Sequence, residues 1–283
     1  MRVVITGAYG QLGSDLKRLL EQEKSIELYP FSQEEMDITD QTILKIKMDV
    51  AKPDIILHCA ANTNVDGCEL ESDEAYRVNT FGTRNVAVEA LRHQSKMVYI
   101  STDYVFDGSS KNPYHELSSP NPISVYGASK LAGEDMVRHL CNKYFIVRTS
   151  WLYGVEGNNF VKTILKLVED RDNITIVDDQ IGCPTYSRDL AGVLILLMGT
   201  EAYGTYHVTN SGQCSWHEFA CEILEKRSIR DKKVHPIKTV DLGRPAPRPH
   251  YSVLTSLALK NCGIATLSSW QDGLHRFFEE YKN

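Results

Sequence analysis

Three glycines stand directly after a short β-branched run at the start of the chain. The run from Arg2 to Thr6 is followed by Gly7, Gly10 and Gly13, and helical spacing continues from Ser14 to Glu23. In such a strand–turn–helix unit, the first glycine makes a tight turn, the second lets backbone approach a pyrophosphate, and the third lets the helix pack on the strand. The free N–H groups of the helix then face the phosphates. The order predicts a dinucleotide-binding α/β fold, although the spacing is GxxGxxG and not the common GxGxxG.

The second expected strand does not decide between the two nicotinamide dinucleotides. It covers Ile26 to Tyr29 and ends in Pro-Phe-Ser-Gln, without the acidic side chain that usually binds the ribose of NAD and without an arginine for a 2′-phosphate. NADPH and NADH therefore both remain candidate cofactors, with NADPH favoured. Asp37 and Ile38 come next. The Asp37 carboxylate could accept from an adenine amino group or cap the helix expected after it.

The composition excludes several classes of protein. The 283 residues carry 31 basic and 37 acidic side chains, a net charge of −6, whereas a nucleic-acid partner usually requires a basic face. No apolar run reaches the roughly 18 residues that span a bilayer. Because the first residues run straight into a strand pattern, we expect no signal peptide. The seven cysteines form no CxxC pair. We expect a cytoplasmic protein with reduced thiols, no membrane or nucleic-acid partner and no metal-ligand cluster.

Two later strands end in residues that suit a ligand crevice. The strand expected from Asp54 to Cys59 is followed by Ala60 and Ala61, whose small side chains leave room for a ligand. The strand expected from Lys96 is followed by hydroxyl and carboxyl groups, on Thr102, Asp103 and Tyr104. Open α/β sheets bind their ligands at the carboxyl ends of such strands. Turn and cap chemistry would account for the same residue types, so both interpretations stay open here.

A tyrosine and a lysine four residues apart form the candidate catalytic pair. Tyr126 and Lys130 lie on a helix expected to run to about Cys141, so their side chains share one face. An ammonium near a phenol favours the phenolate and lowers the pKa of the tyrosine, which suits proton transfer near neutral pH. The alternative is an ordinary pair of surface neighbours.

The second half predicts a smaller region beside the dinucleotide-binding one. We expect a doubly wound parallel Rossmann sheet built from residues 1–150 with about 174–209, and a smaller substrate domain built from about 151–173 with 210–283. Ser215 and Glu218 have the spacing of a helix capping box. Arg244 and Arg248 lie in a proline-rich loop and could grip a pyrophosphate, or remain solvated surface charges.

Seven segments in order resemble one enzyme family. They are TGAYGQLG at 6–13, CAANTNVDGCE at 59–69, VNTFGTRNVA at 78–87, STDYVFDG at 101–108, SVYGASKLAGE at 124–134, VRTSWLYG at 147–154 and DQIGCPTYSRDLA at 179–191. The YxxxK pattern resembles short-chain dehydrogenase/reductases of the extended type. STDYVFDG, TSWLYG and QxGxPT together narrow the resemblance to the dTDP-4-dehydrorhamnose reductases, over nearly the whole chain.

The resemblance implies roles for individual residues. Tyr126 would be the general acid, Lys130 would bind the nicotinamide ribose and lower the pKa of Tyr126, and Thr102 would hold the substrate oxygen. The sugar would be bordered by Val65, Asp103, Tyr104, Trp151 and, through its pyrophosphate, Arg248. The dinucleotide would contact Gly7, Gly10, Gln11, Leu12, Gly13, Asp37, Ile38, Ala60, Ala61 and Thr63. Thr255 departs from the family, whose members often carry Asp there, so the C-terminal end of the substrate site is less defined.

The resemblance also implies an activity, an assembly and two alternatives. The activity is NAD(P)H-dependent reduction of the C4 ketone of dTDP-4-dehydro-6-deoxy-L-mannose to dTDP-L-rhamnose. Relatives form homodimers, some with Mg²⁺ at the interface. One alternative is a non-catalytic regulatory subunit, since the beta subunit of methionine adenosyltransferase resembles the same reductases. The other is a different sugar-nucleotide 4-keto reductase or an epimerase.

Overall fold

A six-stranded parallel sheet forms the centre of the molecule in the computed structural model, which describes residues 1–281. Its strand order is β10-β5-β4-β3-β1-β2, and every neighbouring pair is parallel. The strands are β1 Arg2–Thr6, β2 Glu27–Phe31, β3 Ile55–His58, β4 Lys96–Thr102, β5 Tyr144–Thr149 and β10 Gly204–His207. The order turns back between β1 and β3, and ligands of open α/β sheets bind at such a point. The predicted doubly wound fold is confirmed.

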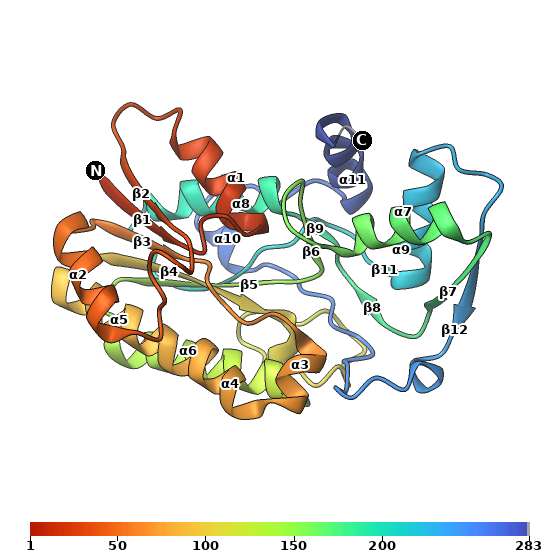
Figure 1. The fold of residues 1–283 in the computed structure, drawn as a ribbon, viewed down its shortest axis with the longest axis horizontal. Coiled ribbons are helices and arrows are strands. Elements are labelled where there is room, and N and C mark those ends of the chain that lie inside the picture. Colours follow the sequence, from red (N-terminus) through yellow and green to blue (C-terminus); the bar gives the residue numbers. More distant parts are fainter. Residues whose placement is uncertain (282–283) are drawn as a thin grey trace.

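Helices cover both faces of this sheet (Figure 1). One face carries α2 Gln41–Ala51, α5 Thr83–His93 and α6 Val125–Leu140, and the other carries α1 Gln11–Leu20, α8 Ser187–Met198 and α10 Ala258–Asn261. Apolar residues at helical spacing make the contacts. Leu16 and Leu194 belong to the apolar core between the sheet and α1 and α8. Met48 and Val86 belong to the apolar core between the sheet and α2 and α5. Burial of these faces holds the carboxyl ends of the strands in a fixed arrangement.

The helical segment that ends with α5 is divided. The segment from 72 to 93 consists of α4 Ser72–Tyr76, the π-helical turn η1 Arg77–Gly82 and α5, and a short helix α3 Val65–Leu70 precedes it. Asn79 lies within η1 and is buried. It accepts from the N–H of Asn62 at 2.8 Å and donates to Ser129 Oγ at 3.0 Å. The wide turn thus lets one side chain connect the loop after β3 to α6.

A second region lies at the far end of the molecule and has its own apolar core, around Ile164, Phe219 and Phe277 (Figure 1). It contains α7 Phe160–Asp170, β7 Asn173–Val177, α9 Trp216–Lys226, β12 Lys233–Ile237, the 3₁₀ turn η3 Thr239–Leu242 and α11 Trp270–Glu280. Short strands connect it to the sheet, namely β6 Leu152–Tyr153 with β9 Thr185–Tyr186, and β8 Ile181–Gly182 with β11 Cys214–Ser215. The predicted capping box of Ser215 and Glu218 is present.

The chain passes between the two regions more than once. The boundary expected near residue 174 falls within β7, which pairs with β12 of the second region. The next long helix, α8, packs on the central sheet, and β10 joins that sheet beside β5. The division into two domains stays a prediction.

Neither a membrane-spanning helix nor a group of metal ligands is found among the described residues. None of the helices within residues 1–281 is long and apolar enough to cross a membrane. In the same range, no group of three or more His, Cys, Asp and Glu side chains is arranged to hold a metal ion.

Candidate active site

Two adjoining cavities run along the carboxyl ends of the central strands. One, of about 440 Å³, extends from the glycine turn toward the second region, and the other, of about 630 Å³, extends past the end of β2. Both are lined by Gly7, Gly10, Cys59, Ala61 and Thr63. The two cavities therefore form one elongated crevice, which suits a ligand with two halves joined in the middle.

The glycine turn at the centre of the crevice fits a pyrophosphate. Gly7 has a φ of +65°, and a Cβ on Gly13 would lie 2.2 Å from the carbonyl oxygen of Gly7. Gly10 is the N-cap of α1 and makes no side-chain cap bond. Because no side chain caps them, the first N–H groups of α1 are open to an anion. The side chain that follows, Gln11, has a buried Oε1 without a hydrogen-bond partner among residues 1–281. The cradle and its open donors fit a dinucleotide.

The second cavity is the candidate site for the adenosine half of a dinucleotide. Asp37 and Ile38 line it as predicted, and the Asp37 carboxylate accepts from the N–H and the hydroxyl of Thr39, at 2.8 and 2.9 Å. Arg77 also lines this cavity, although the sequence did not single it out. Its guanidinium donates to Glu74 at 2.6 Å and to Thr39 Oγ1 at 2.6 Å. A cation thus lies beside the expected ribose end.

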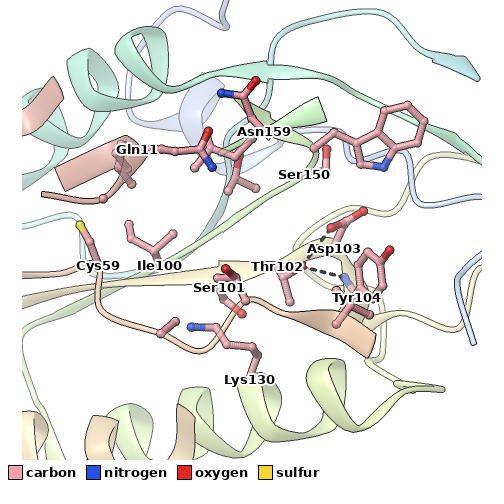
Figure 2. A pocket seen from close by; sticks show the side chains of 18 of the residues that line it. Gln11, Cys59, Ile100, Ser101, Thr102, Asp103, Tyr104, Lys130, Ser150 and Asn159 are labelled. Atoms are coloured by element: carbon pink, nitrogen blue, oxygen red, sulfur yellow. Dashed lines mark hydrogen bonds between the residues drawn. The ribbon is translucent and has the colours of Figure 1, made fainter. Parts of the chain in front are cut away.

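The predicted catalytic side chains meet in the first cavity. Thr102 ends β4, and Tyr126 and Lys130 come from the first turns of α6, which begins after the N-cap Ser124. Figure 2 shows Lys130 and Thr102 on the same side of the cavity. Desolvation raises the pKa of Tyr126, and a hydrogen bond with Thr102 opposes that shift. Burial lowers the pKa of Lys130 to about 7, against the opposing charge of Glu134.

The direction of the Tyr126 shift differs from the sequence expectation. We expected Lys130 to lower the pKa of Tyr126, but desolvation outweighs other influences on the phenol. The Lys130 Nζ instead lies over the ring of Tyr99, 4.2 Å from its centroid. Tyr126 is therefore a neutral phenol at neutral pH in this structure, which is the form that can donate a proton.

The part of the cavity wall formed by Asp103, Trp151 and Trp216 is polar and aromatic. Asp103 is buried and accepts from Thr102 Oγ1 at 3.0 Å, while its Oδ2 has no partner within the described part of the chain. Burial raises the pKa of Asp103 to about 6. Trp151 adopts a positive φ of 47° and stacks on Trp216, with ring centroids 3.5 Å apart and an interplanar angle of 7°. This wall offers a hydrogen-bond acceptor and an apolar plate to a sugar.

Comparison with known proteins places the chain in a family. The family described as RmlD substrate binding domain matches residues 1–283. The chain belongs to this family. It is 41% identical over 279 residues to the spore coat polysaccharide biosynthesis protein SpsK of Bacillus subtilis, covering 99% of this chain and 97% of that protein. It is also 41% identical over 285 residues to dTDP-4-dehydrorhamnose reductase of Aggregatibacter actinomycetemcomitans, covering 96% and 97%.

A solved structure agrees with this assignment. The crystal structure of dTDP-4-dehydrorhamnose reductase from Bacillus anthracis, in complex with NADP, has a TM-score of 0.96 and 49% sequence identity, and the match covers 99% of each chain. The resemblance inferred from the seven sequence segments is therefore confirmed.

Most residues predicted for the RmlD-type site lie in the crevice. The first cavity is lined by Gly7, Gly10, Gln11, Leu12, Gly13, Ala61, Thr63, Val65, Thr102, Asp103, Tyr104, Tyr126, Lys130 and Trp151. Asp37, Ile38 and Ala60 line the second. Arg248 lines neither cavity. Its guanidinium binds both carboxylate oxygens of Asp66, at 3.0 and 2.9 Å, and Arg244 binds the same carboxylate at 3.0 Å. The individual roles stay predictions.

Sequence reasoning missed several residues of the RmlD-type site. Trp216 and Asn159 both line the first cavity. Asn159 caps α7, accepting from the N–H of Lys162 at 3.1 Å, and an asparagine directly before an amphipathic run is a signal that could have been used. Trp216 begins α9 far along the chain, and nothing local indicates that it meets Trp151.

Proposed function

We propose that this protein reduces the C4 ketone of dTDP-4-dehydro-6-deoxy-L-mannose to dTDP-L-rhamnose, with NADPH or NADH as cofactor and NADPH favoured. One observation carries the proposal. Thr102, Tyr126 and Lys130 converge in a cavity that continues directly into the glycine turn. A ketone in that cavity would lie between a proton donor and a bound dinucleotide. Full-length similarity to a dTDP-4-dehydrorhamnose reductase supports the substrate.

The chain's own residues would bind the cofactor along the crevice and move one proton. When bound, the nicotinamide supplies the hydride that reduces C4. The N–H groups of α1 bind the pyrophosphate, and Lys130 donates to the nicotinamide ribose. Thr102 Oγ1 hydrogen-bonds the carbonyl oxygen, and Tyr126 Oη transfers its proton to that oxygen as the C4 alcohol forms. Solvent then returns a proton to Tyr126.

The wall formed by Asp103, Trp151 and Trp216 would orient the sugar for this transfer. The free Oδ2 of Asp103 accepts from a sugar hydroxyl, and the stacked rings of Trp151 and Trp216 cover one side of the sugar. Holding the ketone against both the hydride donor and Tyr126 supplies much of the rate gain, because a bound pair avoids the entropy of an encounter.

The regulatory-subunit alternative is less well supported. A subunit that only binds a dinucleotide does not need Thr102, Tyr126 and Lys130 together, and here all three line one cavity. A different 4-keto sugar nucleotide is the remaining alternative. Homodimer formation, Mg²⁺ at a dimer interface, a cytoplasmic location and the lack of a nucleic-acid partner stay predictions.

The test mixes the protein with dTDP-4-dehydro-6-deoxy-L-mannose and NADPH or NADH, follows the nicotinamide absorbance and identifies the product sugar. We expect oxidation of the cofactor and formation of dTDP-L-rhamnose. Tyr126→Phe should lower kcat by about 10² to 10⁴-fold while NADPH still binds. If neither cofactor is oxidised by the wild-type protein, the regulatory function is favoured. A product other than rhamnose would point to the other reductase.

A further inference from the structure

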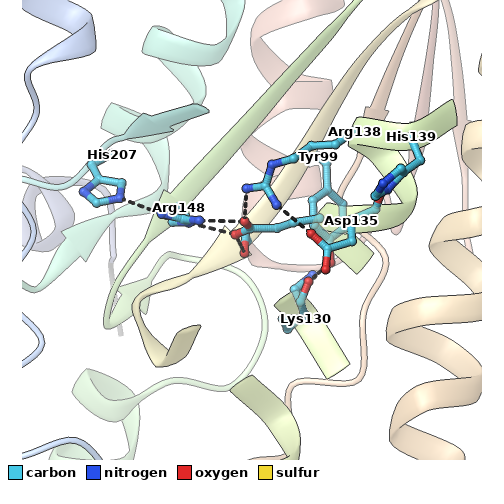
Figure 3. Close-up of polar contacts among 9 residues, drawn as sticks. Tyr99, Lys130, Asp135, Arg138, His139, Arg148 and His207 are labelled. Atoms are coloured by element: carbon cyan, nitrogen blue, oxygen red, sulfur yellow. Dashed lines mark hydrogen bonds and ion pairs between the residues drawn. The ribbon is translucent and has the colours of Figure 1, made fainter. Parts of the chain in front are cut away.

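A buried carboxylate lies one helical turn after Lys130. Glu134 is fully buried on α6 and accepts four hydrogen bonds. Arg148 donates to Oε1 at 2.8 Å and to Oε2 at 2.7 Å, Ser101 donates to Oε1 at 2.6 Å, and Arg138 donates to Oε2 at 2.5 Å. Figure 3 shows the side chains of Arg148, from β5, and Arg138, from α6, converging. A charge held this completely is fixed in place and is costly to remove.

Two of the three residues that donate to Glu134, Ser101 and Arg148, come from the strand ends that carry the site. Ser101 directly precedes Thr102 on β4, and Arg148 directly precedes Thr149 on β5. These residues are paired across the sheet, Ser101 opposite Arg148 and Thr102 opposite Thr149. One carboxylate therefore ties α6 to both strand ends. Because Tyr126 and Lys130 are on that helix, Glu134 sets how far they lie from Thr102.

Tyr99 also contacts Lys130. Its Nζ lies 4.2 Å from the centroid of the Tyr99 ring, and the Tyr99 hydroxyl donates to the Lys130 carbonyl oxygen at 3.1 Å. Gly133 allows this approach, since a Cβ there would lie 2.4 Å from Tyr99 Oη. The His58 ring also stacks with Tyr99, and burial lowers the pKa of His58 to about 3, so it stays neutral.

The groups that face Lys130 include one carboxylate among several neutral ones. His58 and Cys59 come from the end of β3, Tyr99 from β4, and Tyr126 and Glu134 from α6 itself. Burial raises the pKa of the Cys59 thiol to about 12, so this thiol is neutral. The Glu134 carboxylate favours the charged form of Lys130. The same carboxylate accepts from the guanidinium groups of Arg148 and Arg138. Without the carboxylate, Lys130 would lose the negative charge that favours its protonated form.

We propose that Glu134 is a positioning residue for the reduction: it fixes the Tyr126–Lys130 helix against Thr102 and supplies the negative charge that keeps Lys130 protonated. Fixing the helix affects hydride and proton transfer. Keeping Lys130 protonated affects cofactor binding. The proposal rests on the proposed function only for the effect on turnover.

The test compares Glu134→Gln with two matched variants. Glu134→Gln removes the charge and keeps the shape. Asp135→Asn removes a charge from the next residue, which also binds Arg138, at 2.9 Å, but whose side chain is 51% exposed. Glu134→Asp keeps the charge and shortens the side chain. NADPH affinity is measured by nicotinamide fluorescence without any sugar, and kcat and KM with sugar, from about pH 6 to about pH 9.

We expect separate effects from charge and from reach. In Glu134→Gln, NADPH binding should weaken at a pH at least about one unit lower than in the wild type, because Lys130 loses its proton earlier. Its kcat should fall about 10- to 100-fold with little change in KM for the sugar. Glu134→Asp should lower kcat without moving the pH of NADPH release, and Asp135→Asn should match the wild type in both. Equal pH dependence of NADPH binding in Glu134→Gln and wild type would overturn the proposal.

A further variant covers the case in which Glu134→Gln does not fold, which thermal unfolding would reveal. Ser101→Ala keeps the charges and removes only the link to β4, so kcat should fall while the pH dependence of NADPH binding stays that of the wild type. Wild-type turnover in folded Ser101→Ala would then overturn the proposal. If the wild-type protein binds NADPH but does not reduce the sugar, the proposed function fails, and the fluorescence comparison of Glu134→Gln with Asp135→Asn still decides the role of Glu134.

Discussion

Gly13→Ala should weaken NADPH binding by moving the start of α1. A Cβ at this position would lie 2.2 Å from Gly7 O, 2.8 Å from Ala8 Cα and 2.9 Å from Ala8 C. All three are backbone atoms, which cannot rotate away, and the closest is more than an ångström short of an ordinary 3.4 Å contact. The helix must therefore retreat from β1 by about 1 Å. Overpacking of this kind costs about 1–3 kcal/mol of folding free energy.

The effect on the cofactor follows from the same displacement. The N–H groups that face the phosphates move with α1, and hydrogen bonds to charged groups contribute about 1.5–3 kcal/mol each. Loss of one such bond should weaken NADPH binding about 10- to 100-fold. The measurement is NADPH affinity by fluorescence titration, with thermal unfolding of the same samples.

The chain provides a matched control for this substitution. Gly192 lies in α8, and a Cβ there would meet nothing within 4 Å. Gly192→Ala should leave NADPH affinity unchanged and stabilise the protein by about 0.5–1 kcal/mol, because a helical glycine loses more backbone entropy than alanine on folding. Wild-type affinity and stability in Gly13→Ala would refute the close-packing account of the glycine turn.

Three further substitutions have distinct expected results. Trp216→Ala removes the stacking partner that holds Trp151 at its positive φ, so KM for the sugar nucleotide should rise by about tenfold, and an unchanged KM in steady-state assays would contradict a sugar-facing plate. Asp66→Asn should free Arg248 from its bidentate pairing; faster amide hydrogen exchange of residues 244–250 in the variant is the expected readout, and equal exchange rates would argue against the pairing. Asp103→Asn should remove a pH dependence of stability: the pKa of Asp103 is raised from 3.8 to about 6 in the folded protein, so the folded state binds the extra proton and stability falls as pH rises between those values. Thermal unfolding should therefore show Asp103→Asn more stable than the wild type above about pH 6 and equal to it at lower pH, and parallel curves for the two proteins would exclude this linkage.

The residues that could be predicted from the sequence are those whose position follows from local pattern. Thr102 follows a strand, and strand ends of a parallel sheet meet at one edge. Tyr126 and Lys130 share a helix face because they are four residues apart. Gly7 and Gly13 are required by the turn between β1 and α1. Each of these positions is fixed by its neighbours in the chain.

The features that escaped prediction depend on contacts between distant segments. The partner of Arg248, Asp66, is 182 residues away in the chain and no local pattern indicates it, while contact of Arg248 with a pyrophosphate stays a prediction. The pKa of Tyr126 was expected to fall, and desolvation by the folded protein reverses that direction. The π-helical turn η1 has the same residue types as an ordinary helix, so only the contacts of Asn79 reveal it.

The late arrival of β10 has a consequence for synthesis of the chain. β5 ends at Thr149, and its partner on the open side, β10, starts only at Gly204. At ordinary rates of translation, the residues between them take roughly 3 to 11 s to emerge from the ribosome. During that interval the backbone N–H and C=O groups along one side of β5 have no strand to pair with, and such an exposed edge invites pairing with another nascent chain. Any fragment that stops before Gly204 keeps this edge of β5 unpaired. A single cut in the chain before Gly204 therefore leaves the central sheet with an open edge that can aggregate.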